Sequence, residues 1–408
     1  MDVGGWTSDV LPLQAGIPAL TAIIRDRIRV NGPVSFAWFM EQALYHPEHG
    51  YYSSDRAGIG RGGDYFTNVS VGPVFGQLLA TQFVEIWEKL GRAENFTIVE
   101  QGAHHGEFAR DVLESIRQET PNLFAALRYR IVEPSAKLRD AQSKTLADFG
   151  NKIDWRESIN ALEPFEGLHF ANELIDAFPV HLIKTKGRGA VPEFSWMEKC
   201  VDLDENEFVF TERPIADARL RDHVEKLPLP EGGYETEVNI AALAWVADLS
   251  ARLNRGYLLS IDYGFSRADF YSEHRMSGTL QCRSQHRLLD SPFAAIGESD
   301  ITAHVEWTTL AEKAEASGLR IAGFADQHHF LTGIISESPR IAEEGSPKTR
   351  RALQTLLHPE MLGRSFQVLA LSKGIDPEIR LRGFKFARDP LVALGLDPEG
   401  HRAVDVIG

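Results

Sequence analysis

Cysteine is scarce in this 408-residue chain, which contains only Cys200 and Cys282. Two cysteines are too few for a disulfide framework or a four-cysteine zinc site, and they suit a reducing compartment. No apolar run approaches the ~18 residues that a membrane-spanning helix requires. The first basic residue is Arg25, and no basic region precedes an apolar stretch, which is typical neither of a secretory signal nor of a mitochondrial transit peptide. These absences predict a soluble cytoplasmic protein without membrane insertion.

Positive charge is also in the minority, since 43 Lys and Arg residues stand against 58 Asp and Glu residues and give a formal net charge of -15. A protein of this charge has no overall attraction for phosphate backbones, so nucleic acid is not expected as a partner. The proportions of hydrophobic residues (43%) and charged residues (25%) are typical of a globular protein. At ~150 residues per domain, the length predicts two to three domains, or one large domain with insertions.

Several catalytic signatures are absent as well. The chain has no G-x-x-x-x-G-K-[ST] phosphate loop and no G-x-S-x-G elbow, which excludes P-loop nucleotidases and serine hydrolases of the α/β class. It does contain two adjacent histidine pairs, His104-His105 and His328-His329. Adjacent residues rarely point at one ion, and both cysteines lie far away in the sequence, so we expect no metal site.

The N-terminal ninety residues favour helices around a long loop. Apolar spacing predicts two helices within residues 16–46, separated at Pro33, and a third helix from 74 to 90. Residues 46–70 are rich in glycine and aromatic residues and show no period, which predicts a loop. Loops of this length are uncommon in a compact domain unless they have a function.

Beyond residue 95 strands and helices alternate, which predicts an α/β fold with a doubly wound, mainly parallel sheet. Residues 193–210 alternate as a hairpin that turns at 204–206, and we interpret the hairpin as an insertion. The segments 318–325 and 364–372 are compatible with an antiparallel edge. The expected parallel strands are 96–102, 127–133, 167–172 and 255–262.

Glycines and an acidic residue follow the first two strands, at the edge where α/β sheets bind ligands. Gly102 and Gly106 let the backbone turn sharply, although this spacing by itself is more often plain turn chemistry. It is not the dinucleotide fingerprint, because His104 and Glu107 interrupt the glycine spacing. Glu133 suits the two hydroxyls of a ribose, and its alternative role is to cap the following helix. Together the two loops favour a nucleoside ligand.

A second polar group follows the expected strand 167–172. Asn172, Glu173 and Asp176 are expected on a turn of helix, which would place the two carboxylates on one face. That arrangement suits a cation or the fork of a guanidinium, and its alternative is a helix cap with a solvated pair. His304 could act as a base or a hydrogen-bond partner near neutral pH, although a lone histidine is more often structural.

Seven segments, ordered along most of the chain, carry a resemblance to a known family. They are ALYHPEHGYYSS (43–54), GRGGDYFTNVSVGPVFGQLLA (60–80), the glutamate-glycine loop (100–106), IVEPSAKLRDAQ (131–142), ANELIDAFPVH (171–181), IDYGF (261–265) and DITAHVEW (300–307). In these segments the chain resembles the MidA family of S-adenosylmethionine-dependent methyltransferases, over about residues 18 to 375. That family includes a mitochondrial protein arginine methyltransferase needed for respiratory complex I assembly.

The resemblance implies a class I methyltransferase core with N-terminal helical additions and an inserted hairpin. Residues 1–92 would cover the cofactor site, and 93–375 would form the methyltransferase domain with an insertion near 187–235. Residues 376–408 would be a C-terminal tail. The implied cofactor is S-adenosyl-L-methionine, and the residues implied to bind it are Asp64, Thr67, Glu100, Gly102, His104, Gly106 and Glu133.

Roles within the site are also implied by the resemblance. Asp64 and Thr67 would fold over the cofactor, the two glycines would line its methionine part, and Glu133 would hold its ribose. The implied catalytic residues are Asn172, Glu173, Asp176 and His304. Asn172 and Glu173 would face the departing methyl group.

The leading interpretation is a protein methyltransferase with arginine as the acceptor, in which Glu173 and Asp176 pair with the guanidinium. The expected partner is a protein substrate, and a respiratory-complex subunit is an extrapolation from the mitochondrial relative. The family's E-x-G-x-G-x-G loop has His104 at its middle glycine, where an imidazole could occupy space that the cofactor needs. The alternative is therefore a non-catalytic assembly or binding protein with weakened or lost cofactor binding. A nicotinamide dehydrogenase is disfavoured by the glycine spacing.

Overall fold

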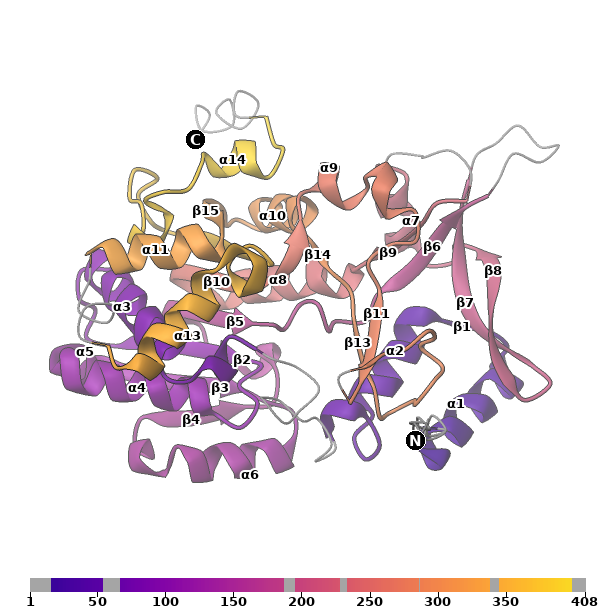
Figure 1. Ribbon diagram of the computed structural model, residues 1–408, viewed down its shortest axis with the longest axis horizontal. Helices are drawn as coiled ribbons and strands as arrows, with labels where there is room; N and C mark the ends of the chain where they lie inside the picture. The colour runs from indigo at the N-terminus through magenta and orange to yellow at the C-terminus, as the bar shows by residue number, and fades with distance from the viewer. Residues whose placement is uncertain are drawn as a thin grey trace, which may run out of the picture.

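The computed structural model describes the residue ranges 16–53, 67–186, 195–227, 233–285, 287–337 and 345–397. A central sheet has helices on both faces, and a smaller layer lies beside it (Figure 1). The strand order of the central sheet is β15-β16-β10-β5-β2-β3-β4, and β14 pairs with the end of β10. The strands are β2 (Phe96–Gln101), β3 (Leu127–Val132), β4 (Ile153–Arg156), β5 (Phe165–Asn172), β10 (Leu253–Phe265), β14 (Val305–Glu306), β15 (Arg320–Asp326) and β16 (Phe366–Lys373).

The strands from β4 to β10 pair in parallel, whereas β16 runs antiparallel between β10 and β15. The expected doubly wound, mainly parallel sheet is confirmed, but the antiparallel strand lies one place inside the edge. β4 has no counterpart among the expected strands because it is only four residues long and buries only Ile153. β10 continues past Asp262 to Phe265 because its last two residues pair with β14.

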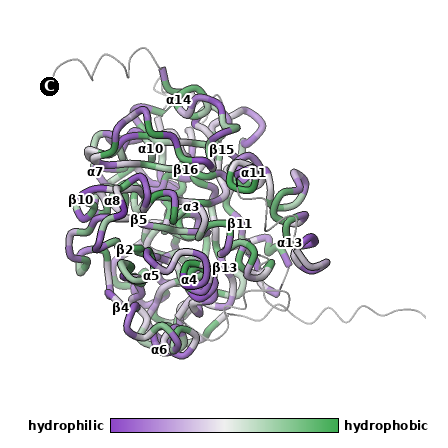
Figure 2. Tube along the Cα trace, turned by 90° about the vertical axis from the view of Figure 1, so that its left-hand side faces the viewer, coloured by the Kyte–Doolittle hydropathy of each residue, from purple (hydrophilic) through white to green (hydrophobic). Residues whose placement is uncertain are grey.

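Helices pack on both faces of the central sheet through apolar stripes. One face is covered by α3, α4, α11 and α13, and the other by α8 and α10. Green and purple alternate along α13 in Figure 2, because Leu353 and Leu356 are buried on one side of that helix only. In the described part of the chain, no helix is long and apolar enough to cross a membrane. The helices are α3 (Val74–Lys89), α4 (Glu107–Glu119), α8 (Ile240–Arg252), α10 (Trp307–Ala316), α11 (Gln327–Glu337) and α13 (Pro347–Leu357).

The smaller layer combines the N-terminal helices with the inserted hairpin. β1 pairs with β7, which ties α1 and α2 to the β7-β8 hairpin, and this hairpin turns between Asp204 and Glu207 as expected. The same sheet includes β6 and β9, so its elements extend beyond the insertion expected near 187–235, and the domain boundaries stay a prediction. The elements are α1 (Pro18–Asn31), β1 (Val34–Ser35), α2 (Phe36–Tyr45), β6 (His181–Thr185), β7 (Trp196–Asp204), β8 (Glu207–Pro214) and β9 (Glu235–Val238).

A third small sheet, in the order β12 (Arg287–Leu288), β11 (Gln281–Ser284) and β13, completes this layer. Its strand β13 (Asp300–Thr302) lies beside α2 in Figure 1, and one buried cluster contains Phe39 and Met40 of α2 together with Ile301 of β13. Packing of that kind fixes the relative positions of elements that are far apart in the sequence. The end of α2 and the start of β13 are therefore held together, next to the central sheet.

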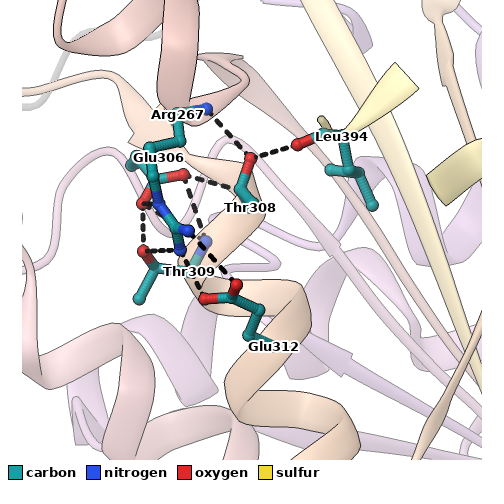
Figure 3. A network of polar contacts seen from close by, with 6 residues as sticks. All are labelled: Arg267, Glu306, Thr308, Thr309, Glu312 and Leu394. Carbon is teal, nitrogen blue, oxygen red and sulfur yellow. Dashed lines mark hydrogen bonds and ion pairs between the residues drawn. The ribbon is translucent and has the colours of Figure 1, made fainter. Parts of the chain in front are cut away.

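The C-terminal residues up to 397 include a short helix, α14 (Pro390–Ala393), whose following residue contacts the start of α10 (Figure 3). The hydroxyl of Thr308 donates a hydrogen bond to the Leu394 carbonyl at 2.6 Å and accepts one from the Arg267 N-H at 2.9 Å. The Glu306 carboxylate accepts the Thr308 N-H at 2.8 Å and so caps α10. This network fixes the chain directly after the predicted site residue His304.

Candidate active site

A cavity of about 1020 Å³ lies where β2, β5 and β10 end. Its wall combines loops of the central sheet with residues of the N-terminal segment and of β13. The predicted site residues that line it are Thr67, Glu100, Gly102, His104, Asn172, Glu173, Asp176 and His304. Gly106 and Glu133 are not part of the lining, and Asp64 lies outside the described residues. The structure therefore brings most of the predicted residues to one place.

The loop after β2 has a backbone that favours glycine at three positions. Gly102, His104 and Gly106 have φ angles of 81°, 45° and 88°. The left-handed region costs a non-glycine residue roughly 1–2 kcal/mol. The Gln142 side-chain amide donates to the His104 carbonyl at 2.8 Å and helps to hold this conformation. His104 thus follows the same left-handed backbone as its flanking glycines.

The side chain of His104 lies against that of its neighbour. The ring centroids of His104 and His105 are 3.8 Å apart. The potential ligand atoms of these two histidines and of Glu107 all lie within 4.8 Å of one another, close enough for a metal ion. Although adjacent histidines rarely point at one ion, His104 and His105 do point to the same place. The expected absence of a metal site stays a prediction.

Glu100, at the end of β2, is buried on the cavity wall. The hydroxyl of Tyr129 donates a hydrogen bond to Glu100 Oε2 at 2.8 Å. Burial raises the pKa of Glu100 to about 8, although the bond from Tyr129 opposes this rise. At neutral pH this carboxyl is therefore mostly protonated, and it can donate a hydrogen bond as well as accept one.

Glu133 follows β3 directly and is 6% exposed. Its Oε1 accepts the Ser135 N-H at 2.9 Å, and its Oε2 accepts the Gln142 side-chain amide at 3.2 Å. The helix α6 (Ala136–Thr145) begins directly after Ser135, and Ser135 is its cap, since its hydroxyl accepts the Leu138 N-H at 3.3 Å. The capping role considered for Glu133 is therefore wrong, because Glu133 binds the N-H of the cap residue instead. The ribose-binding role stays a prediction. Gln142, which links this carboxylate to the loop after β2, is a residue that the sequence analysis did not name.

The segment after β5 does not form the expected turn of helix. Glu173 has a φ of 53°, and the next residues form bends and a turn. The cause is Asp262 on β10, whose Oδ2 accepts the N-H groups of Leu174, Ile175 and Asp176 at 3.1, 2.8 and 3.2 Å. A carboxylate bound by successive N-H groups holds a turn in place of the helical hydrogen bonds. The prediction that the Glu173 and Asp176 carboxylates share a helical face is therefore wrong, although both line the cavity.

Glu173 is tied to its neighbours through one oxygen. Its Oε1 accepts the Asn68 N-H at 3.1 Å and the Asn172 side-chain amide at 2.9 Å. Asn68 also donates to the side-chain oxygen of Asn172 at 3.0 Å, so the N-terminal segment reaches the end of β5. Burial raises the pKa of Glu173 to about 8, opposed by these two hydrogen bonds. The predicted pair Asn172 and Glu173 is therefore held in a defined geometry.

Asp176 faces groups from the smaller layer. The hydroxyl of Tyr52 donates to Asp300 Oδ1 at 2.7 Å, and the hydroxyl of Tyr45 donates to the Ala177 carbonyl at 2.9 Å. Burial raises the pKa of Asp176 well above its usual range, and the nearby carboxylates of Asp262 and Asp300 raise it further. The site therefore contains an acidic cluster of Glu173, Asp176, Asp262 and Asp300, in which Glu173 is partly buried and the three aspartates are buried. All of them except Asp262 line the cavity.

His304 lies at the rim of this cluster and is largely buried. Its backbone N-H donates to the Thr279 hydroxyl at 3.0 Å. Its ring packs near the ring of Phe265, with 5.1 Å between the two centroids. Burial lowers the pKa of His304 to about 4, and the positive charge of Arg275 lowers it further. Its Nδ1 has no hydrogen-bond partner among the described residues. His304 is thus a neutral imidazole at pH 7, and its predicted role as a base is not tested by these contacts.

Thr67 lines the cavity from the N-terminal segment, and its hydroxyl lies 2.9 Å from the Ser70 hydroxyl. The sequence analysis did not assign Asn68, Tyr52, Asp262 or Asp300 to the site. Asp262 could have been found from its place at the end of an expected strand. Tyr52 and Asp300 lie 248 residues apart, so no local pattern connects them.

A family model described as "Putative S-adenosyl-L-methionine-dependent methyltransferase" matches residues 78–325. Among curated proteins, the chain is 27% identical over 401 residues to "Protein arginine methyltransferase NDUFAF7 homolog, mitochondrial" from Drosophila melanogaster, covering 89% of this chain and 86% of that protein. It is 26% identical to the Homo sapiens "Protein arginine methyltransferase NDUFAF7, mitochondrial", covering 93% and 88%.

A solved structure with the same fold contains a cofactor product. It is a COG1565 superfamily member from Burkholderia thailandensis bound to S-adenosyl-homocysteine, with 32% sequence identity and a TM-score of 0.80. The match covers 90% of this chain and 94% of that chain. A native structure of a COG1565 protein from the same organism matches with a TM-score of 0.78.

Proposed function

This chain belongs to the S-adenosyl-L-methionine-dependent methyltransferase family whose model it matches, and from that premise we propose that its methyl acceptor is the guanidinium group of an arginine in a protein. The methyl donor is S-adenosyl-L-methionine. Support for arginine comes from the relatives that are named protein arginine methyltransferases. The observation that carries the proposal is the group of carboxyls from the acidic cluster that lines the cavity, Glu173, Asp176 and Asp300.

The loop after β2 fits the cofactor. When bound, S-adenosyl-L-methionine supplies an electrophilic methyl group on a sulfonium sulfur. A Cβ added at Gly102 would make ordinary van der Waals contact with Leu174 Cδ1 at 3.4 Å, so the φ of 81° rather than a lack of space favours glycine at this position. Gly102 and Glu100 are the residues proposed to hold the cofactor, together with the backbone of His104 and Gly106. Asp64 and Thr67 stay predictions for the same role.

The acidic cluster suits a cation with several donors. In the described part of the chain, neither Glu173 nor Asp176 forms an ion pair with a basic side chain. Buried carboxylates are costly unless a positive charge compensates them. An arginine guanidinium supplies that charge and presents five N-H donors in a planar fork. We therefore expect guanidinium binding to favour ionisation of these carboxyls.

Catalysis would then depend mainly on alignment. Methyl transfer requires the acceptor nitrogen to approach the methyl carbon in line with the breaking bond, and orientation can contribute most of the rate. Glu173 and Asp176 would direct one guanidinium nitrogen. When the new N-C bond forms, that nitrogen must release one proton, and a carboxylate of the cluster is placed to accept it.

A second function is favoured by one specific observation, the His104 side chain on the cavity wall. If this imidazole prevented cofactor binding, the fold would serve as a non-catalytic binding or assembly protein. The backbone of His104 supports the catalytic function instead, since its φ of 45° lies in the same left-handed region as those of Gly102 and Gly106.

The identity of the protein substrate is also a proposal. The relatives named above are mitochondrial, and a respiratory-complex subunit is proposed as the substrate by extension from them. The net charge of -15 favours a substrate segment with basic residues.

The test is transfer of a labelled methyl group. Purified protein is incubated with methyl-labelled S-adenosyl-L-methionine and a protein extract, and the products are hydrolysed to amino acids. We expect the label in methylarginine, and its loss in a folded Glu173→Gln variant. Label in a different amino acid, or wild-type transfer by Glu173→Gln, would contradict the proposal.

A further inference from the structure

The acidic cluster has two sources in the chain. Glu173 and Asp176 come from the central sheet, whereas Asp300 comes from β13 of the smaller layer. Asp300 lines the cavity and is 3% exposed. Tyr52, from the short helix η1 (Tyr51–Ser53), lines the same cavity, and its hydroxyl donates a hydrogen bond to Asp300 Oδ1.

We propose that Asp300, oriented by Tyr52, selects a guanidinium over other cations at the acceptor site. This inference rests on the proposed function, because it assumes that arginine is the acceptor. Asp300 would touch the substrate as a binding residue. Tyr52 would act through Asp300 as a positioning residue.

Two contacts fix Asp300 relative to Asp176. The N-H of Ala303, the residue directly after β13, donates to the Asp176 carbonyl at 2.9 Å. Tyr45 and Tyr52 pack with ring centroids 5.5 Å apart, and the Tyr45 hydroxyl binds the carbonyl of the residue after Asp176. The carboxylates of Asp176 and Asp300 therefore belong to one rigid arrangement, although they come from different layers.

This arrangement suits a planar cation better than a point charge. A guanidinium can donate to separate carboxylates from different edges of one plane, whereas an ammonium is a compact donor. Tyr51 and Tyr52 also line the cavity, and aromatic rings bind guanidinium groups through their faces. The hydrogen bond from Tyr52 engages Asp300 Oδ1 and so restricts how the carboxylate presents itself to a ligand.

The test uses small probes rather than a protein substrate. Protein saturated with S-adenosyl-homocysteine is titrated calorimetrically with N-methylguanidine, with methylammonium as the charge control and N-methylurea as the shape control. We expect N-methylguanidine to bind most tightly in the wild type. Asp300→Asn and Tyr52→Phe should each weaken that binding roughly tenfold, with the preference for guanidinium over ammonium reduced.

Matched controls separate binding from folding. Tyr257→Phe removes another buried hydroxyl, one without a hydrogen-bond partner among the described residues, and Asp290→Asn changes an aspartate outside the cavity. Both should bind N-methylguanidine like the wild type. All variants should keep wild-type affinity for S-adenosyl-homocysteine. If Asp300→Asn does not fold, the preference of Tyr52→Phe for N-methylguanidine over methylammonium tests the inference.

The outcomes distinguish this inference from the proposed function. Unchanged guanidinium selectivity in Asp300→Asn or Tyr52→Phe, with binding lost in Glu173→Gln, would overturn the inference and leave the arginine acceptor in place. A wild type that binds S-adenosyl-homocysteine but no N-methylguanidine would overturn both. If Asp300→Asn weakened the binding of N-methylguanidine and of methylammonium equally, Asp300 would attract any cation through its charge alone. That result would also overturn the proposed selectivity.

Discussion

The two halves of the cavity are built in different ways. The half that we propose for the cofactor is formed by the loop after β2, which contributes Glu100, Gly102 and His104 to the cavity wall. Gln142 and Glu133 do not line the cavity but support this loop through hydrogen bonds, so the residues of the cofactor half and its support lie within about forty positions of one another. The half that we propose for the acceptor, the acceptor half, joins the ends of β5 and β10 to the N-terminal segment and β13, and its Tyr52-Asp300 bond spans 248 residues. The cofactor half is therefore a local property of one part of the sheet, whereas the acceptor half depends on how two layers pack.

This difference predicts that the acceptor half is the easier one to break by a single substitution. A change there can remove a contact between layers, whereas a change in the cofactor half affects one loop. The following substitutions and conditions test that contrast.

The largest effect is expected for Asp262→Ala. It removes the acceptor of three N-H groups in the turn after β5, and each buried N-H left unpaired costs roughly 1–3 kcal/mol. We expect the free energy of unfolding to fall by about 3 kcal/mol or more, as measured by denaturant titration, together with loss of methyl transfer. The matched control is Asp326→Ala, another strand-end aspartate, which accepts one backbone N-H, from His329, and contacts the partly exposed ring of the same residue. It should cost only about 1 kcal/mol. Equal losses for the two variants would contradict the central role of Asp262.

Glu173→Gln should come next, acting on rate rather than on stability. The amide keeps the shape and can still accept the Asn68 N-H, but it carries no charge to attract a guanidinium. We expect kcat to fall roughly 100-fold, since loss of one preorganised electrostatic contact costs about that much. Affinity for S-adenosyl-homocysteine should stay at the wild-type value because the substitution lies in the acceptor half. A parallel loss of cofactor affinity would mean that the two halves are not separable.

The pH dependence of stability tests both halves together. Burial raises the pKa of Glu100 and of Glu173 to about 8, so between the ordinary carboxyl pKa and pH 8 the folded state binds more protons than the unfolded state. Buried histidines act oppositely, but only below about pH 6.5, since burial lowers the pKa of His169 to about 3 and that of His304 to about 4. The free energy of unfolding should therefore fall by about 1 to 2 kcal/mol per carboxyl between pH 6.5 and pH 8.

Glu100→Gln provides the check on this pH effect. Its amide cannot ionise, so unfolding titrations at pH 6.5 and pH 8 should differ less than they do in the wild type. If the free energy of unfolding of Glu100→Gln fell between pH 6.5 and pH 8 as much as that of the wild type, the pH effect would come from the acceptor half alone.

The smallest effect is expected for His104→Gly. The substitution relieves the left-handed backbone at φ 45° but adds flexibility to the unfolded chain, and the two effects nearly offset. We expect the free energy of unfolding to change by less than about 1 kcal/mol in thermal or denaturant titrations. A larger loss would mean that the His104 side chain itself stabilises the loop.

The same contrast explains what could be predicted from the sequence. The parallel sheet and the loop after β2 follow from hydrophobic runs that end at Glu100 and Glu133, which are local signals. The helical turn expected after Asn172 was wrong because Asp262, ninety residues later, captures the N-H groups that a helix would use. Asp300 and Tyr52 have no local signal, since their proximity results from the packing of α2 against β13.

The most direct test of the account is a calorimetric titration of the wild-type protein with S-adenosyl-L-methionine and S-adenosyl-homocysteine, with NAD as the control ligand and His104→Gly alongside. The account predicts that the wild type binds both sulfur ligands with Kd values of ~1 to 100 μM, and does not bind NAD. An absence of binding in the wild type, with binding restored in His104→Gly, would contradict it. That result would identify a methyltransferase fold that no longer holds its cofactor and serves as a partner-binding protein.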